Sequence, residues 1–376
     1  MLSDLSIFAT RLRDHIAICA DEFTTGTPDS SPALLAHADA EFNGLALMLF
    51  TLQFQHNAAY RKICAARKVS PNDINHWSQI PAVPTSAFKE LELTSLLPRE
   101  RTHAFHSSGT TEQRPSRHFH NGESLAIYEA ALWPWLRENL RFTIADLRLL
   151  NLTPPAGQVP HSSLVHMLET VRQKVGAPPT SFVGTLAADK TWTLDFPATQ
   201  TALEAAMSDC QPLVLFGTAF SFVHLLDYLA EKNLRIQLPP GSRVMETGGY
   251  KNRSRTLPKT ELHALTTDRL GIPPEQIICE YGMSELSSQA YDQGSDASRT
   301  FHFPPWARVQ IISPEAGQAV AEGETGLLRI FDLANVFSVL AIQTEDLAIR
   351  RGDGFELIGR AAQSEPRGCS LMTVDS

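Results

Sequence analysis

The stretch at residues 276–285 reads QIICEYGMSE. Its apolar first part, Gln276 to Cys279, predicts a short buried strand, and the polar segment from Glu280 to Glu285 follows it directly. In open α/β sheets, ligands bind at the carboxyl ends of the strands. The stretch therefore predicts a strand of such a sheet and a binding loop at its end.

Short apolar runs alternate with helical patterns over the middle of the chain. Apolar residues recur at helical spacing between residues 122 and 140, and Gly176 closes a second helical pattern. Strands that alternate with helices predict a parallel or mixed sheet covered on both faces. The other predicted elements are helices in the first hundred residues, with apolar or amphipathic runs at 42–52 and 56–66, a helix at 162–175, and strands at 147–152, 213–216 and 243–246.

The last hundred residues have a different character, with short alternating runs and turn signals such as Gly352-Asp353-Gly354. This pattern favours a small β-rich subdomain over more doubly wound sheet. The predicted fold class is therefore α/β, with mixed sheets covered by helices and a small C-terminal β subdomain. The strands predicted for this subdomain are 308–312, 326–331, 346–350 and 355–358.

The composition excludes several classes of function. The chain has 376 residues, with 43% hydrophobic and 19% charged residues, which is ordinary for a globular protein. Its formal net charge of -9 argues against broad electrostatic binding of nucleic acid or of an anionic membrane. Small molecules and proteins are the partners that this composition favours.

The cysteines and the N-terminus favour a reducing compartment. The five cysteines are widely spaced and form no CxxC pair, so neither a disulfide framework nor a zinc site is indicated. The N-terminal residues show no basic region followed by an apolar run, and no stretch is long and apolar enough to span a membrane. We expect a cytoplasmic protein without a membrane span. The cysteines are Cys19, Cys64, Cys210, Cys279 and Cys369.

The segment from Ser107 to Arg117 reads SSGTTEQRPSR and gathers hydroxyl groups and a glycine in one polar loop. Such a loop offers backbone N–H and side-chain O–H donors to phosphate oxygens, and Arg114 and Arg117 add positive charge. Taken alone, the segment fits an ordinary Ser/Thr-rich turn equally well.

Two further segments are polar and follow predicted strands or precede a hairpin. In the segment 280–285, a carboxylate could hold magnesium beside phosphates, and the aromatic ring could stack on a base; a strand-to-helix turn with a solvated Glu is the alternative. In QTEDL (343–347), Asp346 could accept both hydroxyl hydrogens of a ribose, and the following hairpin ends in Gly359-Arg360. By itself this third segment is an exposed acidic turn.

Together and in this order, the three segments resemble the adenylate-forming superfamily of acyl-CoA synthetases, luciferases and peptide-synthetase adenylation domains. SSGTT resembles its phosphate loop, YGMSE its aromatic-Gly-x-Ser/Thr-Glu motif, and TED with GFELIGR its ribose-Asp and hinge-Arg region. The resemblance implies a catalytic role for Arg360 and magnesium binding by Glu285. The nucleotide-binding residues that it implies are Ser107, Ser108, Gly109, Thr110, Thr111, Arg114, Arg117, Tyr281, Gly282, Met283, Ser284 and Asp346.

Other segments resemble one branch, the acyl-protein synthetase family of the LuxE type, with phenylacetate-CoA ligases as more distant relatives. They include NAAYR (57–61), IPAVPTSAFK (80–89), LFGTAF (215–220) and ETGGYK (246–251). The resemblance implies that Gly248, Gly249 and Tyr250 border the adenine. Together with the sequence patterns above, we expect four regions: an N-terminal helical part of the core (1–100), an α/β nucleotide- and acyl-binding core (101–300), a β-rich subdomain (301–360) and a mobile C-terminal tail that carries Cys369 (361–376).

The sequence departs from the superfamily in two places. The phosphate loop usually continues with Gly, Pro and Lys, whereas this chain has Glu112, Pro115 and then Ser116-Arg117. The sequence therefore does not decide which basic side chain contacts the phosphate. The sequence stops at Ser376, and we expect no C-terminal lid domain with its catalytic Lys.

Cys369 lies in the segment PRGCSLM, where the acyl-protein synthetases look similar. The resemblance implies that this thiol attacks the acyl-adenylate and holds the acyl group as a thioester, and a thiolate is a good nucleophile for a mixed anhydride. An incidental terminal cysteine is the alternative. The other four cysteines are expected to be buried and inert. His103 and His106 could act as a base or contact phosphate, but a packing or solvated role is expected for each. His161 and His166 have a spacing that makes a poor ligand pair on a helix, and no metal other than magnesium is expected.

The resemblance implies an ATP-dependent, AMP-forming acid–thiol ligase that uses ATP and Mg²⁺. A carboxylic acid, in this family a fatty acid, would form acyl-AMP, pass to Cys369 and then to a protein partner such as an acyl reductase or a carrier protein. The alternatives are a coenzyme A or carrier-protein ligase that does not use Cys369, and a non-catalytic scaffold that binds an acyl group or nucleotide. Phe216, Phe220 and Phe222 could line an acyl pocket, although core packing explains them equally well.

Overall fold

The computed structural model describes residues 3–25, 32–107, 114–142, 148–248, 257–292 and 299–360. Within these ranges one large sheet runs through the molecule in the strand order β12-β13-β14-β15-β11-β10-β9-β8-β7-β4, and β1 pairs in parallel with β14. The strands of this sheet are β1 (Val83–Pro84), β4 (Arg148–Asn151), β7 (Leu213–Thr218), β8 (Arg243–Thr247), β9 (Ile277–Tyr281), β10 (Ala290–Asp292), β11 (Thr300–His302), β12 (Ala307–Ile312), β13 (Thr325–Asp332), β14 (Ala341–Arg351) and β15 (Gly354–Arg360).

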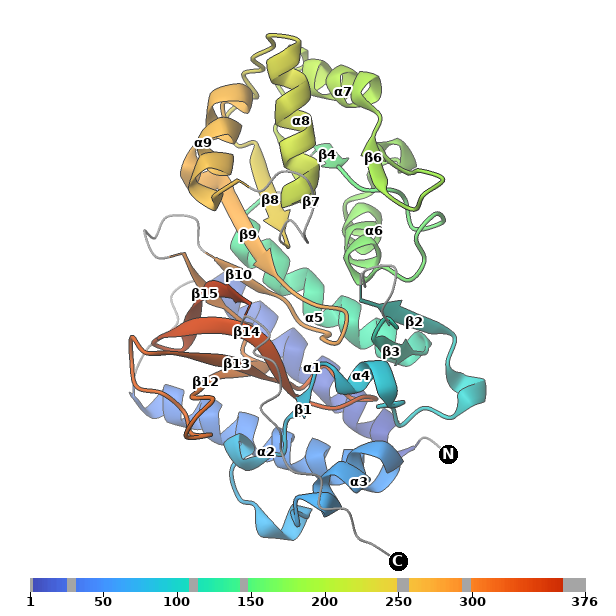
Figure 1. The fold of residues 1–376 in the computed structure, drawn as a ribbon, viewed down its shortest axis with the longest axis vertical. Helices are drawn as coiled ribbons and strands as arrows, with labels where there is room; N and C mark the ends of the chain where they lie inside the picture. Colours follow the sequence, from blue (N-terminus) through green and yellow to red (C-terminus); the bar gives the residue numbers. More distant parts are fainter. Residues whose placement is uncertain are drawn as a thin grey trace, which may run out of the picture.

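The helices cover this sheet, and two short hairpins stand beside it (Figure 1). The hairpins are formed by β2 (His103–His106) with β3 (Arg117–His120) and by β5 (Gly184–Leu186) with β6 (Trp192–Leu194). The α-helices are α1 (Asp4–Thr25), α2 (Pro32–His56), α3 (Ala58–Ala66), α4 (Ala87–Glu90), α5 (Gly122–Leu140), α6 (Ser163–Val175), α7 (Phe196–Ser208), α8 (Ala219–Glu231) and α9 (Lys259–Leu270).

The sheet has a parallel half and an antiparallel half that meet at β9. Strands β4, β7, β8 and β9 are parallel, whereas β9 pairs antiparallel with β10, and the pairing continues through β11 to β15. Parallel neighbours need long crossover connections, and helices α8 and α9 supply those between β7, β8 and β9. The carboxyl ends of the four parallel strands therefore lie along one edge of the sheet.

Strand β7 shows why helices cover both faces of the parallel half. Leu213 and Leu215 pack in a core with α8 and α9, while Val214 and Phe216 pack in a second core with α5 and α6. Side chains alternate between the two faces of a strand, so an unbroken apolar strand is buried on both sides. A third core joins α1 and α2 to the antiparallel strands, as their positions in Figure 1 also show.

The helices predicted at 122–140 and 162–175 are confirmed as α5 and α6. The Ser162 side chain accepts a hydrogen bond from Val165 N, and Gly176 ends α6 with a left-handed φ of 70°. Both signals are local, which is why the sequence reveals them. The chain beyond residue 300 supplies mainly antiparallel strands, as the β-rich prediction requires, and β11 and β10 connect them to the parallel half. The proposed region boundaries stay predictions.

One strand prediction was wrong at its end. The strand predicted at 276–279 runs from Ile277 to Tyr281, so Glu280 and Tyr281 belong to β9 and not to the following loop. The reason is non-local: β10 pairs with this end, with Ala290 opposite Tyr281. Among the described residues, none of the helices combines the length and the apolar character that crossing a membrane would require.

Candidate functional site

Three of the expected site residues meet where β9, β14 and β15 come together. The Tyr281 hydroxyl donates to Asp346 Oδ2 at 2.7 Å, and Arg360 Nε lies 3.5 Å from Asp346 Oδ1. The Asp346 side chain is 14% exposed and that of Arg360 is 80% exposed. Asp346 is therefore not in an exposed turn: it lies within β14, opposite Arg360, with its carboxylate oriented by a buried hydroxyl.

Tyr281 has a hydroxyl that binds Asp346, but its ring has no open face on which a base could stack. The residue is 7% exposed, and its ring contacts Phe301, Phe303 and Phe355 nearly edge-on. Burial is the main cause that raises the pKa of Tyr281 well above its usual value, and the Asp346 carboxylate raises it further. The phenol thus stays a hydrogen-bond donor at neutral pH.

The stem of the hydroxyl-rich loop contacts the loop after β9. Ser107 Oγ accepts a hydrogen bond from Ser116 N at 3.0 Å, which closes the stem. Ser116 Oγ lies 3.4 Å from Ser284 Oγ, and His118 Nδ1 lies 3.0 Å from the Ser284 carbonyl oxygen. The Ser284 hydroxyl donates in turn to Glu285 Oε2 at 2.9 Å. Two segments more than 160 positions apart, each predicted to face phosphate or magnesium, therefore share one small area.

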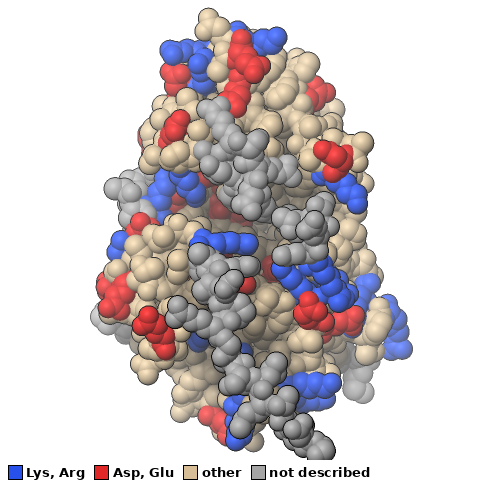
Figure 2. All heavy atoms as spheres, viewed as in Figure 1, with Lys and Arg blue, Asp and Glu red and all other residues tan. Residues whose placement is uncertain are grey.

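Arg117 provides a partly paired cation at this stem. Its Nη1 lies 4.0 Å from Glu92 Oε1, while its buried Nε has no hydrogen-bond partner within the described ranges. Glu92 also accepts from Arg101 at 2.7 Å, and that bond is the main cause that lowers the pKa of Glu92. Arg114 is exposed. Figure 2 shows Lys and Arg side chains near the depression in the middle of this face.

Two buried residues that sequence reasoning missed hold the loop after β9. Asp332 Oδ2 accepts from Ser287 N at 2.9 Å and from Ser288 N at 2.8 Å. Asn335 Nδ2 donates to the Glu285 carbonyl oxygen at 3.0 Å. Both side chains are at most 1% exposed. In the sequence they are two of the four polar residues in the otherwise apolar stretch 327–342, and that pattern does not reveal the partner loop.

Glu280 leaves little room for a side chain at position 282. A Cβ on Gly282 would lie 2.3 Å from Glu280 Oε1, and Glu280 is buried and bound to the Thr247 hydroxyl. Burial raises the pKa of Glu280 to about 7. Gly248 follows β8 at the neighbouring strand end with a φ of 71°, a conformation that glycine adopts readily. The two glycines therefore lie at adjacent strand ends, as the prediction of one nucleotide site requires.

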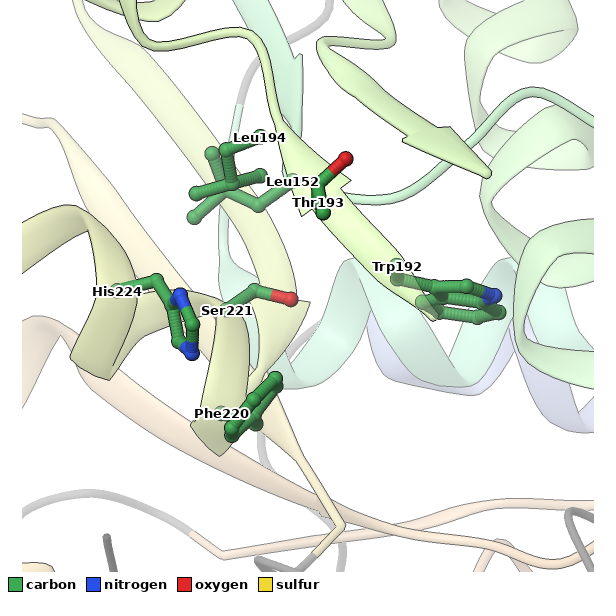
Figure 3. A pocket seen from close by; sticks show the side chains of 7 residues that line it. All are labelled: Leu152, Trp192, Thr193, Leu194, Phe220, Ser221 and His224. Atoms are coloured by element: carbon green, nitrogen blue, oxygen red, sulfur yellow. The ribbon is translucent and has the colours of Figure 1, made fainter. Parts of the chain in front are cut away.

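A small pocket lies at the same edge of the sheet (Figure 3). Leu152 follows β4, Phe220 and Ser221 begin α8 directly after β7, and β6 forms the opposite wall. The Phe220 ring packs on the His224 ring with 4.2 Å between centroids. Phe216 and Phe222, in contrast, are buried in cores on opposite faces of the sheet. Of the three phenylalanines considered for an acyl pocket, Phe220 alone lines this one; its full lining is Leu152, Trp192, Thr193, Leu194, Phe220, Ser221 and His224.

The donor set suits a magnesium nucleotide. Mg²⁺ prefers oxygen ligands, and the Glu285 carboxylate lies beside the Ser284 and Ser116 hydroxyls. The Asp346 carboxylate, oriented by Tyr281, can accept hydrogen bonds from sugar hydroxyls. Met283 packs against the core that contains α1 and α2. Ser108, Gly109, Thr110, Thr111, Gly249, Tyr250 and Cys369 lie outside the described residues.

The histidine and cysteine expectations are partly corrected. His106 stacks on His161 with 4.3 Å between ring centroids, which fits the packing role expected for His106. Cys210 is exposed and not buried, because it follows the end of α7 with a positive φ of 53°. Cys279 is buried as expected but lies among polar groups: Glu246 and Arg299 both contact its sulfur.

The buried His118 predicts a loss of stability in acid. Burial lowers its pKa to about 4, so the folded protein keeps it neutral while the unfolded chain binds a proton below about pH 6.5. The unfolded state then binds more protons, and stability falls as the pH falls from 6.5 to 4, by about 3 kcal/mol in total for this group. His118→Gln, whose amide can still donate to Ser284, should remove this dependence in urea unfolding at several pH values.

The control for this prediction is His103→Gln, at an exposed histidine in the neighbouring strand. The raised pKa of Glu280 acts in the opposite direction, and it cancels when variant and wild type are compared at the same pH. A difference in unfolding free energy between His118→Gln and wild type that stays constant from pH 7.5 to 4.5 would contradict the prediction.

Comparison with known proteins places this chain in a family. The family model described as "Acyl-protein synthetase, LuxE" matches residues 18–375. The long-chain-fatty-acid–luciferin-component ligase of Aliivibrio fischeri is 25% identical over 343 residues, which cover 87% of this chain and 86% of that protein. The ligase of the same name from Vibrio harveyi is 22% identical over 341 residues, covering 86% and 84%.

Solved structures share the fold. A 2-hydroxyisobutyryl-CoA ligase in complex with 2-HIB-AMP and CoA aligns with a TM-score of 0.63 at 14% identity, covering 88% of this chain and 69% of that one. The same ligase in its postadenylation state aligns with a TM-score of 0.61. These likenesses establish an adenylate-forming ligase fold, as expected from the three motifs. With a family match over nearly the whole length, the chain belongs to the acyl-protein synthetase family of the LuxE type.

Proposed function

We propose that this chain activates a fatty acid with ATP, releasing pyrophosphate, and then carries the acyl group as a thioester on Cys369. The observation that carries the proposal is the contact between Tyr281 and Asp346 beside Arg360, close to the place where the stem of the hydroxyl-rich loop meets Ser284 and Glu285. It supports a nucleotide site with separate positions for ribose and for phosphate.

Nucleotide binding follows from these side chains. Asp346 accepts the ribose hydroxyl hydrogens, and Tyr281 keeps its carboxylate oriented through the 2.7 Å hydrogen bond. Donors from residues 107–111, with Arg114 and Arg117, bind phosphate oxygens, because charge-assisted hydrogen bonds to phosphate are strong. Gly248, Gly249 and Tyr250 border the adenine. Glu285 would hold a magnesium ion, which would neutralise part of the phosphate charge.

In the first step, a carboxylate oxygen of the acid attacks the α-phosphorus of ATP. A new P–O bond forms between the acid and the α-phosphorus. The bond between the α-phosphorus and the oxygen that bridges it to the β-phosphorus breaks, and pyrophosphate leaves with both electrons of that bond. The work of the protein is to position the two reactants and to stabilise the charge that develops on the phosphoryl oxygens. The exposed guanidinium of Arg360 lies beside the Asp346 carboxylate, which is proposed to bind the ribose, and it can turn towards the charge on the phosphoryl oxygens.

In the second step, the Cys369 thiolate attacks the acyl carbon of acyl-AMP. A C–S bond forms, the C–O bond to AMP breaks, and AMP leaves. Cys369 lies nine positions after Arg360, and an extended segment of that length spans at most about 30 Å. The thiol can therefore reach the site around Asp346. A protein partner, such as an acyl reductase or a carrier protein, then accepts the acyl group.

A fatty acid is the favoured substrate for two reasons. The ligases of Aliivibrio fischeri and Vibrio harveyi carry "long-chain-fatty-acid" in their names. The pocket between β6 and α8 has four apolar side chains among its seven lining residues, and Leu152 and Phe220 lie just after the parallel strands β4 and β7. We place the start of the acyl chain there, against Leu152 and Phe220.

The proposal is tested by the products formed from MgATP and a series of carboxylic acids of increasing length. We expect AMP and pyrophosphate in equal amounts, formed only when a medium or long fatty acid is present. ADP and phosphate would mean an acyl phosphate and would overturn the proposal, as would the absence of any turnover. Acyl transfer to added coenzyme A without an adduct on the protein would overturn the role of Cys369.

A further inference from the structure

A buried cluster of three metal-binding side chains lies behind the nucleotide site. Glu246 on β8 stands directly opposite Cys279 on β9, and His263 approaches from α9. The exposed fractions of the three residues are 1%, 0% and 6%. Helix α9 lies beside β8 and β9 in Figure 1.

The distances between the ligand atoms suit one small ion. Cys279 Sγ lies 3.0 Å from Glu246 Oε1, which lies 3.5 Å from His263 Nε2, and Sγ and Nε2 are 3.9 Å apart. In a tetrahedral zinc site, bonds of about 2.0 to 2.3 Å place neighbouring ligand atoms about 3.3 to 3.6 Å apart. The three atoms already form a triangle close to one face of such a tetrahedron.

A second observation points to a missing ligand. Glu246 Oε2 is buried and has no hydrogen-bond partner in the part of the chain that the structure describes. Buried polar atoms are nearly always paired, and an orphaned one requires an explanation. A cation in the triangle would satisfy Oε2 as well as Oε1 if the carboxylate binds it through both oxygens.

The neighbouring charges can adjust to a divalent ion. Lys259 Nζ lies 3.5 Å from Glu246 Oε1, and Arg299 Nη1 lies 3.4 Å from the sulfur of Cys279 and 2.9 Å from Asp292 Oδ2. While the Cys279 thiol is protonated, the negative charges of the Glu246 and Asp292 carboxylates therefore balance the positive charges of Lys259 and Arg299. Because the Lys259 side chain is 43% exposed, its ammonium can turn to solvent, and loss of the thiol proton adds one more negative charge. Arg299 would remain as a donor to the thiolate.

We infer that Glu246, His263 and Cys279 bind a zinc ion that ties the ends of β8 and β9 to α9. Thiolate, imidazole and carboxylate are a ligand set for Zn²⁺, whereas magnesium prefers oxygen alone. Glu246 lies two residues before Gly248, and Cys279 two residues before Tyr281, so the ion would fix the positions of both nucleotide loops. This departs from the expectation that no metal other than magnesium binds.

The test is cobalt substitution in the metal-free full-length protein, without nucleotide. We expect one Co²⁺ per chain and a thiolate-to-cobalt charge-transfer band that Zn²⁺ abolishes by displacement. Cys279→Ser should remove the band and weaken Zn²⁺ binding by about 100-fold or more, measured against a competing chelator, since even outer-shell changes cost up to that much. Cys210→Ser and Cys369→Ser should keep the band.

Folding of the variants is checked by circular dichroism, and His263→Gln serves as a second variant that leaves the thiol in place. It should keep cysteine chemistry intact yet weaken Zn²⁺ binding. A wild-type protein without the band overturns the inference irrespective of the variants. A band that survives Cys279→Ser but disappears in Cys369→Ser also overturns it, because the ion would then bind the proposed acyl carrier.

Discussion

Asp346→Ala is expected to lower fatty-acid-dependent ATP–pyrophosphate exchange by at least about 100-fold, since two hydrogen bonds to a charged group are worth about 3 kcal/mol or more. The substitution removes the proposed ribose acceptor. It also leaves the Tyr281 hydroxyl, on a side chain that is 7% exposed, without its acceptor, and Arg360 without the nearby charge. The measurement is isotope exchange from labelled pyrophosphate into ATP at saturating acid.

Two further variants make this result specific. Tyr281→Phe keeps the carboxylate and loses only the hydroxyl that orients it, so we expect a smaller loss of about tenfold. Asp353→Ala removes an exposed carboxylate from the turn between β14 and β15 and should leave exchange unchanged. If Asp346→Ala exchanged pyrophosphate at the wild-type rate, Asp346 would not be the ribose acceptor.

Cys369→Ser is expected to abolish the acyl adduct on the protein while adenylation continues. A serine hydroxyl is a far weaker nucleophile than a thiolate at neutral pH, so acyl-AMP would find no acceptor on the chain. Intact mass of the protein after incubation with MgATP and a fatty acid measures the adduct, and hydroxylamine should remove it from the wild type.

The matched control is Cys210→Ser, because Cys210 is an exposed thiol elsewhere on the surface. This variant should carry the same adduct as the wild type. If the adduct persisted on Cys369→Ser and were lost on Cys210→Ser, Cys210 would be the acyl carrier and the role proposed for Cys369 would be wrong.

The sequence predicts those features that depend on neighbouring residues. The cap at Ser162 and the left-handed Gly176 fix α6 locally, and the alternating faces of β7 follow from its unbroken apolar run. The three motifs likewise indicate Tyr281 and Asp346 by their order. Family resemblance, and not spacing, supplied the roles of these residues.

Long-range contacts account for what the sequence does not predict. The end of β9 depends on pairing with β10, and the loop after β9 is held by Asp332 and Asn335, more than 40 positions away. The cluster of Glu246, His263 and Cys279 has no motif spacing, because two strands and a helix bring it together. Side-chain identity is visible in the sequence, but these contacts exist only in the folded sheet.

Mass spectrometry of the nucleotides released from quenched Cys369→Ser protein tests the central claim most directly. After brief incubation with MgATP and a long-chain fatty acid, acyl-AMP should be present in an amount close to that of the enzyme, because the proposed acceptor has been removed. ADP with an acyl phosphate, or unchanged ATP with no acyl nucleotide, would contradict the claim that this chain activates its acid as an adenylate.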